Sequence, residues 1–319
     1  KLAAACEAGG IVLLLFAFVP QFGAEGVWVS VFTAISAFCN AGFDLFGRFG
    51  AYSSLVPYVN NYYVQAVIMF MIMAGGLGFM VWVELAEHRK KRRLSLHAKV
   101  VLQFSVIFWV GGAALLALLE WSNPRTMGGL SVPGKIMAAL FQSVSTRTAG
   151  MNTIDLAACS PISKLLMSVL QFIGAAPGST GGGVKVTTFA VLILTIRSVA
   201  QGRDDCVIGG HHIESKTVYR ALTIIVIGAV AAFGSAVVVY YNTAETVSVI
   251  DCIFESCSAF GTVGLSVGVT GQLNTGAKLL YMACMFMGRV GPVSLAISLT
   301  AKPDDNKRKV LPVGHINVG

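Results

Sequence analysis

The sequence predicts an all-α integral membrane protein, and its composition, apolar runs and basic clusters all indicate this class. Of the 319 residues, 55% are hydrophobic and 12% are charged, which is far from the usage of a soluble domain. Runs of about 20 mainly apolar residues recur along the chain, close to the length that crosses a bilayer core. The expected spans are residues 3–19, 64–83, 100–119, 165–172 continued by 186–196, 221–241 and 279–299.

The basic residues predict how these spans are oriented. Lys and Arg concentrate at residues 89–99, 197–220 and 302–309, and by the positive-inside rule these segments, and with them the C-terminus, are cytoplasmic. The same runs lie beside spans and lack interleaved aromatic residues, which argues against a nucleic-acid partner. The expected partner of most of the surface is therefore the lipid bilayer.

Reactive residues give little sign of catalysis. The seven cysteines are scattered and form no CxxC pair, so neither a disulfide framework nor a metal site is indicated. Cys206 with His211 and His212 is interpreted as a solvated turn rather than a metal site. No acid–base pair or nucleophile triad has catalytic spacing, so a non-enzyme is expected. The alternative, an integral membrane enzyme, would use Lys185, His88 and His97 as its polar core.

An internal repeat follows from the expected orientation, because the spans then pair as three hairpins. Their outward connections read "VFTAISAFCNAGFDLFG" (31–47), "LFQSVSTRTAGMNTIDL" (140–156) and "IFESCSAFGTVGLSVGV" (253–269). Each begins as an apolar, helix-compatible segment, reaches a serine and ends at a glycine; the serines are Ser36, Ser145 and Ser258. The middle copy is one residue shorter between its serine and its glycine. The predicted unit is span, short helix, extended glycine strand, span.

The glycine strands predict a cation site. Non-helical backbone at membrane depth is tolerated only where it is buried in protein or lines water. Main-chain carbonyls in such a strand can replace the hydration shell of an ion, and the preceding short helices would direct their negative C-terminal ends inward. The expected ion-binding residues are Asn40, Ala41, Gly42, Thr148, Ala149, Gly150, Thr262, Val263 and Gly264.

The stretch "GAAPGSTGGGVKVTTF" (174–189) interrupts one expected span. A phosphate-binding loop is excluded because Val184 separates Gly183 from Lys185 and no strand precedes it. Close helix packing through small residues is the commoner reason for single glycines, but the glycines and Pro177 exceed what packing is expected to need. A flexible loop at membrane depth is therefore predicted.

Two arginines require partners. Arg289, in "MFMGRVGPVSL", is expected near mid-span, where its insertion costs about 2.5–3.5 kcal/mol and calls for an oxygen partner or water. Arg147 lies beside an expected cation site, which is unfavourable unless a carboxylate shares its charge. Asp155, Asp251 and Glu255 are the candidates, and the sequence leaves the choice open.

Three segments together resemble a known family: "VSTRTAGMNT" (144–153), "GAAPGSTGGGVKVTTFAVL" (174–192) and "MGRVGPVSLA" (287–296). Over essentially its whole length the chain is similar to the Trk/Ktr/HKT superfamily of potassium transporters, and within it to the membrane subunit of the bacterial Ktr system. The resemblance implies outer helix, pore helix, filter strand and inner helix units repeated around a pseudo-fourfold pore. Residues 1–88, 89–200 and 201–302 would be the second to fourth repeats and 303–319 a cytoplasmic tail, with the first repeat expected upstream.

The resemblance also implies a function: K⁺ passes through a carbonyl filter in the bacterial cell membrane, below which an intramembrane loop acts as a gate. The implied gating residues are Gly174, Pro177, Gly178, Ser179, Thr180, Gly181, Gly182, Gly183, Lys185 and, in contact with the loop, Arg289. No organic cofactor is expected. A homodimer on a cytosolic ring of nucleotide-binding regulatory subunits and sodium dependence are implied, and residues 310–319 are expected to contact a second copy.

One alternative concerns the ion. A sodium-selective HKT-like channel has a serine in place of a filter glycine. The three filter positions in this chain are glycine, which favours K⁺ over Na⁺, and the fourth lies in the expected first repeat.

Overall fold

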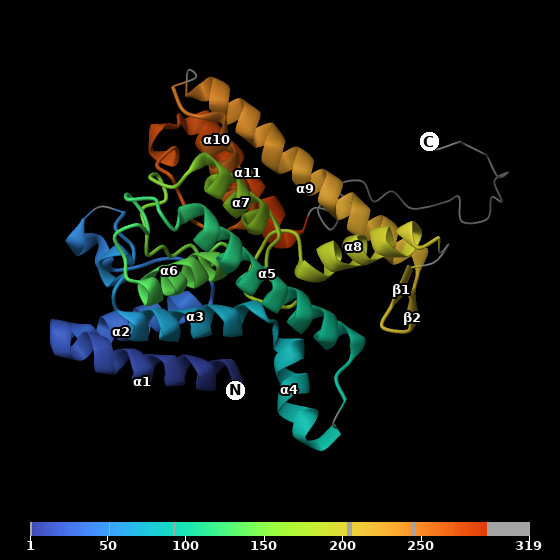
Figure 1. Ribbon diagram of the computed structural model, residues 1–319, viewed down its shortest axis with the longest axis horizontal. Coiled ribbons are helices and arrows are strands. Elements are labelled where there is room, and N and C mark those ends of the chain that lie inside the picture. Colours follow the sequence, from blue (N-terminus) through green and yellow to red (C-terminus); the bar gives the residue numbers. More distant parts are fainter. Residues whose placement is uncertain (1, 51, 92, 203–205, 244–245, 292–319) are drawn as a thin grey trace.

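The computed structural model describes residues 2–50, 52–91, 93–202, 206–243 and 246–291. The second part of the expected last span, the expected tail at 303–319 and the expected contact of residues 310–319 with a second copy lie outside these residues. The described chain is helical, with one small hairpin of two strands (Figure 1).

Three long apolar helices each precede a shorter helix. The long ones are α1 (Leu2–Phe22), α5 (Leu96–Glu120) and α9 (Ser215–Asn242), and each is long and apolar enough to cross a membrane. The short ones are α2 (Glu25–Phe38), α6 (Val132–Ser145) and α10 (Val249–Gly261). Serine side chains at residues 131 and 248 accept hydrogen bonds from the first turns of α6 and α10, which fixes where these helices begin. The short helices therefore occupy the three expected outward connections.

A third group of helices follows the glycine-containing segments. It consists of α3 (Tyr62–Gly76), α7 (Pro161–Phe172), α8 (Val186–Ala200) and α11 (Thr275–Val290). Short 3₁₀ turns lie at Phe46–Phe49, Val56–Tyr58 and Thr270–Gln272. The sheet pairs β1 (Cys206–Ile208) antiparallel with β2 (His211–Ile213), and this hairpin is the departure from an all-α fold within the described part of the chain.

The expected span at 64–83 is not one continuous helix. α3 and α4 (Phe79–Lys91) are bent by 100° at the break between them, and α4 projects away from the body of the molecule (Figure 1). Gly78 lies in the break with φ +83°, and a Cβ there would lie 2.5 Å from the carbonyl oxygen of Pro177. The bend therefore coincides with the place where a distant loop passes against the chain, and composition alone does not reveal such a contact.

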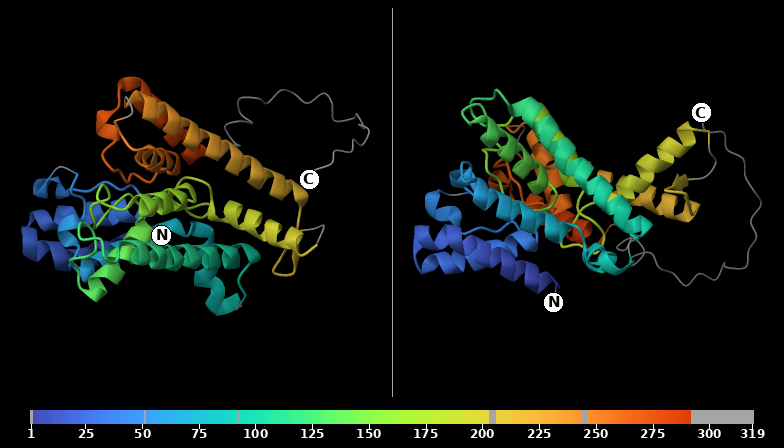
Figure 2. Two further views of the ribbon diagram at one scale, coloured as in Figure 1. Left: turned by 45° about the horizontal axis from the view of Figure 1, so that its top comes forward. Right: turned by 60° about the horizontal axis from the view of Figure 1, so that its bottom comes forward.

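The largest group of buried apolar side chains surrounds the junction of α2, α3 and α6. It joins Phe38 and Ile68 with Phe141, Val144 and Ala149. The left view in Figure 2 places α7 between the layer of α1 to α3 and the helices α9 and α11. The core of the described chain thus encloses the ends of the short helices, where the candidate site lies.

Candidate functional site

The site contains three glycine turns, defined here as residues 40–42, 148–150 and 262–264, which begin within three residues of the ends of α2, α6 and α10. The first residue of each turn has a positive φ: 50° at Asn40, 75° at Thr148 and 52° at Thr262. The third residue, always glycine, has φ of 75°, 81° and 91° in the same order. Glycine reaches this region at no steric cost. The three turns thus share a positive φ at their first and third residues, so turns stand where the sequence predicted extended glycine strands.

A serine at the end of each short helix binds the residue that leaves the turn. Ser36 Oγ donates a hydrogen bond to the carbonyl oxygen of Phe43 at 2.6 Å, and Ser258 Oγ donates to that of Leu265 at 2.7 Å. Ser145 Oγ donates in the same way to Met151. The serine therefore anchors the far end of the turn to the helix in all three copies.

The shorter middle copy keeps this arrangement by closing its helix more tightly. The amide of Ala149 donates to the carbonyl of Ser145, four residues back. In the other two copies the bond from the equivalent amide, at Ala41 or Val263, spans five residues. The missing residue is absorbed where the helix ends, so the turns themselves remain equivalent.

The three glycines converge. A Cβ built on Gly150 would lie 3.2 Å from Gly42 Cα, 3.4 Å from Gly264 Cα and 2.4 Å from the carbonyl oxygen of Val263. A Cβ on Gly42 would lie 2.8 Å from the carbonyl oxygen of Ala149. Gly42 and Gly264 each face Gly150. No side chain fits between these backbones, so glycine is required by close approach as well as by its φ.

Polar side chains without partners mark one end of the turns. Asn40 Oδ1 and Nδ2, Thr148 Oγ1 and Thr262 Oγ1 are buried atoms that meet no hydrogen-bonding group in the described chain. Most buried polar atoms in proteins are paired. These four atoms lie at equivalent positions of the three turns; the three oxygens offer free acceptor capacity, whereas Asn40 Nδ2 can only donate.

A loop between α7 and α8, residues 173–185, crosses directly beneath these side chains; we call it the crossing loop. On one side it is bound to the end of α3. There the amide of Ala176 donates to the carbonyl of Gly76 at 3.0 Å, and the amide of Thr180 donates to that of Gly75 at 3.3 Å. The hydroxyl of Thr180 also donates to the carbonyl of Phe38, at 3.1 Å.

On the other side the loop is bound to α11, since the amide of Gly183 donates to the carbonyl of Gly288 at 3.1 Å. The loop closes on itself through bonds from the amide of Gly174 to Val184 and from that of Val184 to Phe172. It therefore extends from α3 to α11 as a hydrogen-bonded bridge.

The loop glycines are needed for packing, which corrects the expectation that they exceed it. A Cβ on Gly181 would lie 2.2 Å from Thr148 Oγ1, and one on Gly182 would lie 2.1 Å from Thr262 Oγ1. A Cβ on Gly174 would lie 1.9 Å from the carbonyl oxygen of Gly182. These glycines allow the loop to touch the first residues of two turns.

Three cations, Arg289, Lys185 and Arg147, bind carbonyls of the crossing loop. Arg289 donates from Nη1 to the carbonyl of Thr180, and Lys185, the N-cap of α8, donates from Nζ to that of Gly181. Arg289 lies one residue before the end of α11 at Val290, with Gly291 as the C-cap, and the rest of the expected span, residues 292–299, lies outside the described residues. Arg289 occupies the last turn, where a cation interacts favourably with the helix dipole, and its side chain is exposed.

Arg147 binds a carbonyl rather than a carboxylate, which corrects the expectation from the sequence. Its Nη2 donates to the carbonyl of Gly174 at 2.6 Å. Among the described residues, the three candidate acids have other partners. Lys164 Nζ binds Asp251 at 2.7 Å, Asp155 accepts from the amide of Ala157, and Glu255 is bound to the segment after its own turn.

The role of Glu255 was not predicted from the sequence: its carboxylate holds the segment that follows the third glycine turn. Its Oε1 accepts from the amides of Val267 and Val269, both at 3.1 Å, and from Ser266 Oγ. Its Oε2 accepts from Thr270 Oγ1 at 2.9 Å. The available signal was an acid inside an apolar short helix, three residues before the serine.

Other expected groups do not converge. In the described ranges no three His, Cys, Asp or Glu side chains are placed to hold a metal ion. Cys206 is buried, and its Sγ accepts a hydrogen bond from Thr195 Oγ1 at 3.2 Å. His211 lies in β2 and is exposed. Ala41, Ala149 and Val263 are the middle residues of the turns, and Pro177, Gly178 and Ser179 lie in the crossing loop near α4.

The known proteins to which this chain is similar are transport proteins. The family model described as TrkH, cation transport protein, matches residues 6–309. The potassium/sodium uptake protein NtpJ of Enterococcus hirae is 36% identical over 95% of this chain and 66% of its own length. The Ktr system potassium uptake protein B is 34% identical in Bacillus subtilis, covering 97% of this chain and 67% of that protein. In Vibrio alginolyticus it is 38% identical, with coverages of 93% and 64%.

The fold resembles a solved structure, that of the potassium transporter TrkH from Vibrio parahaemolyticus. The TM-score is 0.70 at 19% identity, over 91% of this chain and 62% of that one. The chain therefore spans about two thirds of the length of the relatives it matches.

Proposed function

The chain belongs to the TrkH family of cation transport proteins, and from this premise we propose that it belongs to the membrane subunit of a potassium uptake system. The observation that carries the proposal is the convergence of the three glycine turns on Gly150. Backbone carbonyls that converge beside unpaired polar side chains suit the dehydration of a monovalent cation. The relatives are transport proteins, so we infer that the chain is not an enzyme.

We propose that the three glycine turns, residues 40–42, 148–150 and 262–264, form the ion filter. Gly42 and Gly264 face Gly150 on two sides, as consecutive corners of a ring would, which supports a pseudo-fourfold pore. Domains 1–88, 89–200 and 201–302 would be its repeats and residues 303–319 a cytoplasmic tail. The unpaired oxygens of Asn40, Thr148 and Thr262 would bind the ion at the end that faces the crossing loop.

The crossing loop is proposed to be the gate. It passes against Thr148 and Thr262 through Gly181 and Gly182, and so lies across the ion's path. It is attached to α3 by the amides of Ala176 and Thr180 and to α11 by the amide of Gly183 together with Arg289. Such bonds contribute about 0.5–3 kcal/mol each, so they hold the loop closed yet permit release.

The permeant ion is proposed to be K⁺, with no organic cofactor. Glycine at all three turns favours K⁺ over the alternative, a sodium-selective HKT-like channel. The name of the Enterococcus relative includes both potassium and sodium. The test below therefore measures the uptake of both ions. Location in a bacterial cell membrane with a cytoplasmic C-terminus, a homodimer and a cytosolic nucleotide-binding regulatory ring are further proposals that rest on the Ktr relatives.

The test of the filter uses the intact protein in liposomes, with uptake of a radioactive potassium analogue and of sodium measured separately. Gly150→Ser is expected to abolish potassium uptake, because its Cβ would meet the carbonyl of Val263. The matched control is Gly129→Ser, at an exposed position with nothing within 4 Å of a Cβ. Equal uptake by both variants would overturn the filter assignment.

The gate is tested in the same liposomes. Arg289→Gln is expected to raise uptake in the closed condition, since the contact with Thr180 is weakened. Lys278→Gln changes an exposed cation on α11 whose side chain has no hydrogen-bond partner among the described residues, and it should leave uptake unchanged. Deletion of part of the glycine run at 181–183 is expected to raise ion flux. Unchanged flux in correctly inserted protein would favour a packing role for the crossing loop.

A further inference from the structure

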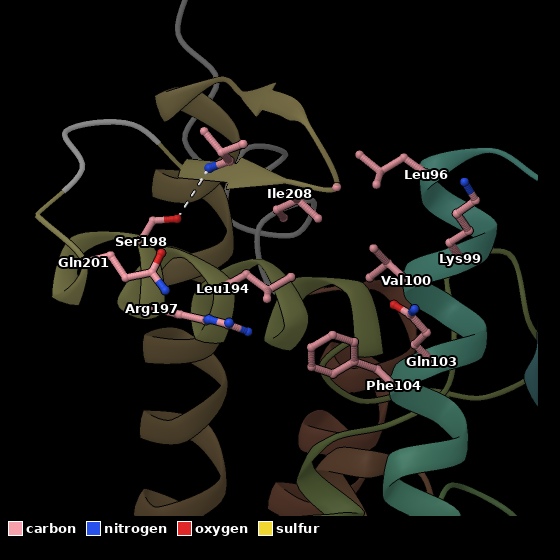
Figure 3. A pocket seen from close by; sticks show the side chains of 12 residues that line it. Leu96, Lys99, Val100, Gln103, Phe104, Leu194, Arg197, Ser198, Gln201 and Ile208 are labelled. Carbon is pink, nitrogen blue, oxygen red and sulfur yellow. Dashed lines mark hydrogen bonds between the residues drawn. The ribbon is translucent and has the colours of Figure 1, made fainter.

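A cavity of about 430 Å³ lies outside the candidate site, between the start of α5, the end of α8 and the β hairpin (Figure 3). Its volume is in the range of ligand sites. The apolar part of its wall includes Val100, Phe104, Leu194 and Ile208. In Figure 3 the side chains of Val100 and Phe104 extend from α5 toward α8. The polar part includes Lys99 and Arg197, which belong to opposite walls.

Among the described residues, no acidic side chain pairs with these two cations. Lys99 and Arg197 are both exposed. Gln103 and Gln201 add amide donors to the same lining. An anion between the two walls would therefore meet two cations and hydrogen-bond donors without displacing an existing partner.

An apolar surface leads away from this cavity along α5. Ile107 lies four residues beyond Gln103 and Val110 seven, which places them on the same helix face. Both are 58% exposed. A free phosphate would leave this surface unused, whereas an acyl chain attached to the phosphate would cover it.

We propose that the cavity binds the phosphate headgroup of an anionic phospholipid, with an acyl chain lying along Ile107 and Val110. The basic residues 89–99 assign this end of α5 to the cytoplasmic leaflet, where anionic lipids bind basic pockets between membrane helices. α8 begins directly after the crossing loop, so a lipid held between α5 and α8 would hold the helix that leaves the loop. The binding test below does not depend on ion conduction.

The experiment places the intact protein in phosphatidylcholine nanodiscs that contain a minor fraction of phosphatidylglycerol. Native mass spectrometry then measures which lipid is retained. The pocket variant is Lys99→Gln with Arg197→Gln. Its matched control is Lys216→Gln with Arg220→Gln, two exposed cations on neighbouring α9 that do not line the cavity.

Wild type and control are expected to retain phosphatidylglycerol equally, and the pocket variant to bind it about 30-fold more weakly, since each cation contributes about 1 kcal/mol. Equal loss in both double variants would overturn the proposal, because it would indicate general surface attraction. Glycerophosphoglycerol and inorganic phosphate serve as soluble probes. If either displaces the lipid, the cavity takes a free phosphate and the lipid assignment is overturned.

A second measurement needs no variant. Phosphatidylglycerol with a photoreactive acyl chain is expected to label the wild-type protein around residues 107–110. Labelling confined to other helices would overturn the proposal even if the pocket variant did not fold. Capture of the cavity by a cytosolic protein, with no lipid retained, would overturn it as well.

Discussion

Arg147 Nη2 lies 2.6 Å from the carbonyl oxygen of Gly174, to which it donates a hydrogen bond. The arginine directly precedes the middle glycine turn, and the glycine begins the crossing loop, so this bond joins turn and loop. The guanidinium carbon also lies 5.0 Å from the centroid of the Phe108 ring. The side chain is 4% exposed, so these two contacts hold a buried cation in place.

Arg147→Lys is expected to lower the free energy of unfolding by about 2–3 kcal/mol. Lysine keeps the charge but loses the planar group that both binds the carbonyl and stacks on the ring. Denaturation of the detergent-solubilised protein measures the change. Arg125→Lys is the control, because Arg125 is exposed and should change stability by no more than about 0.5 kcal/mol. Equal stability of the two variants would mean that the Gly174 contact contributes nothing.

Gly182→Ala is expected to disrupt the crossing loop, because its Cβ would lie 2.1 Å from Thr262 Oγ1 and 3.0 Å from Thr262 Cγ2. Adding Thr262→Ala removes both atoms and should restore much of the lost stability, as expected for residues in direct contact. Thermal unfolding of the single and double variants measures this coupling. Gly234→Ala, where a Cβ meets nothing within 4 Å, is the control. Strictly additive effects at residues 182 and 262 would contradict the close approach.

Glu255→Gln is expected to release the segment after the third turn. The glutamine amide has one acceptor oxygen instead of two. Its NH₂ group would face N–H and O–H groups that now donate to the carboxylate, and two donors cannot bond to each other. A loss of about 2–4 kcal/mol is expected, since bonds to charged groups contribute about 1.5–3 kcal/mol each. Hydrogen exchange should accelerate at residues 266–270.

The control for Glu255 is Glu25→Gln, which removes a carboxylate from the surface ion pair with Arg48. Surface pairs contribute about 0–1 kcal/mol, so this variant should remain close to wild type. If exchange at residues 266–270 is as slow in the Glu255 variant as in the Glu25 variant, the carboxylate does not hold this segment.

Ser258→Ala is expected to cost about 1 kcal/mol, the usual value of one neutral hydrogen bond, and to lower the ratio of potassium to sodium uptake. The carbonyl of Leu265 loses its donor, so the third turn loses its anchor to α10. The control is Ser235→Ala, another buried serine, whose bond to Ala232 stays within α9. If the Ser258 variant keeps the wild-type ratio of potassium to sodium uptake, the hydrogen bond of this serine does not contribute to ion selectivity.

The glycine turns show what a sequence can predict about a site. In each copy the serine lies in the short helix, five or six residues before the glycine, and this spacing recurs in three copies. Local sequence therefore indicated where the helices end and which backbones leave helical geometry. It did not show that Gly42 and Gly264 both face Gly150, because that contact joins segments more than 100 residues apart.

Three of the six expected membrane spans are continuous helices in the described residues, and these were predictable for a similar reason. Transfer of a helix into lipid depends mainly on the composition of about 20 consecutive residues, and α1, α5 and α9 follow their apolar runs closely. Where a distant segment intervenes, composition was insufficient. The 100° bend after Gly76 coincides with the approach of Pro177, and the residues around the bend are as apolar as those of a straight span.

The partners of the charged residues were decided by tertiary structure alone. The sequence indicated that Arg147 needs a partner but favoured a carboxylate, whereas the fold supplies the carbonyl of Gly174 and directs Glu255 to backbone amides. A main-chain carbonyl exists at every residue, so no side-chain pattern can show which one an arginine binds. Sequence thus determined the helices, their repeats and the need to neutralise buried charge. Only the packing of distant segments determined which atoms meet that need, because a hydrogen bond depends on positions to within a fraction of an ångström.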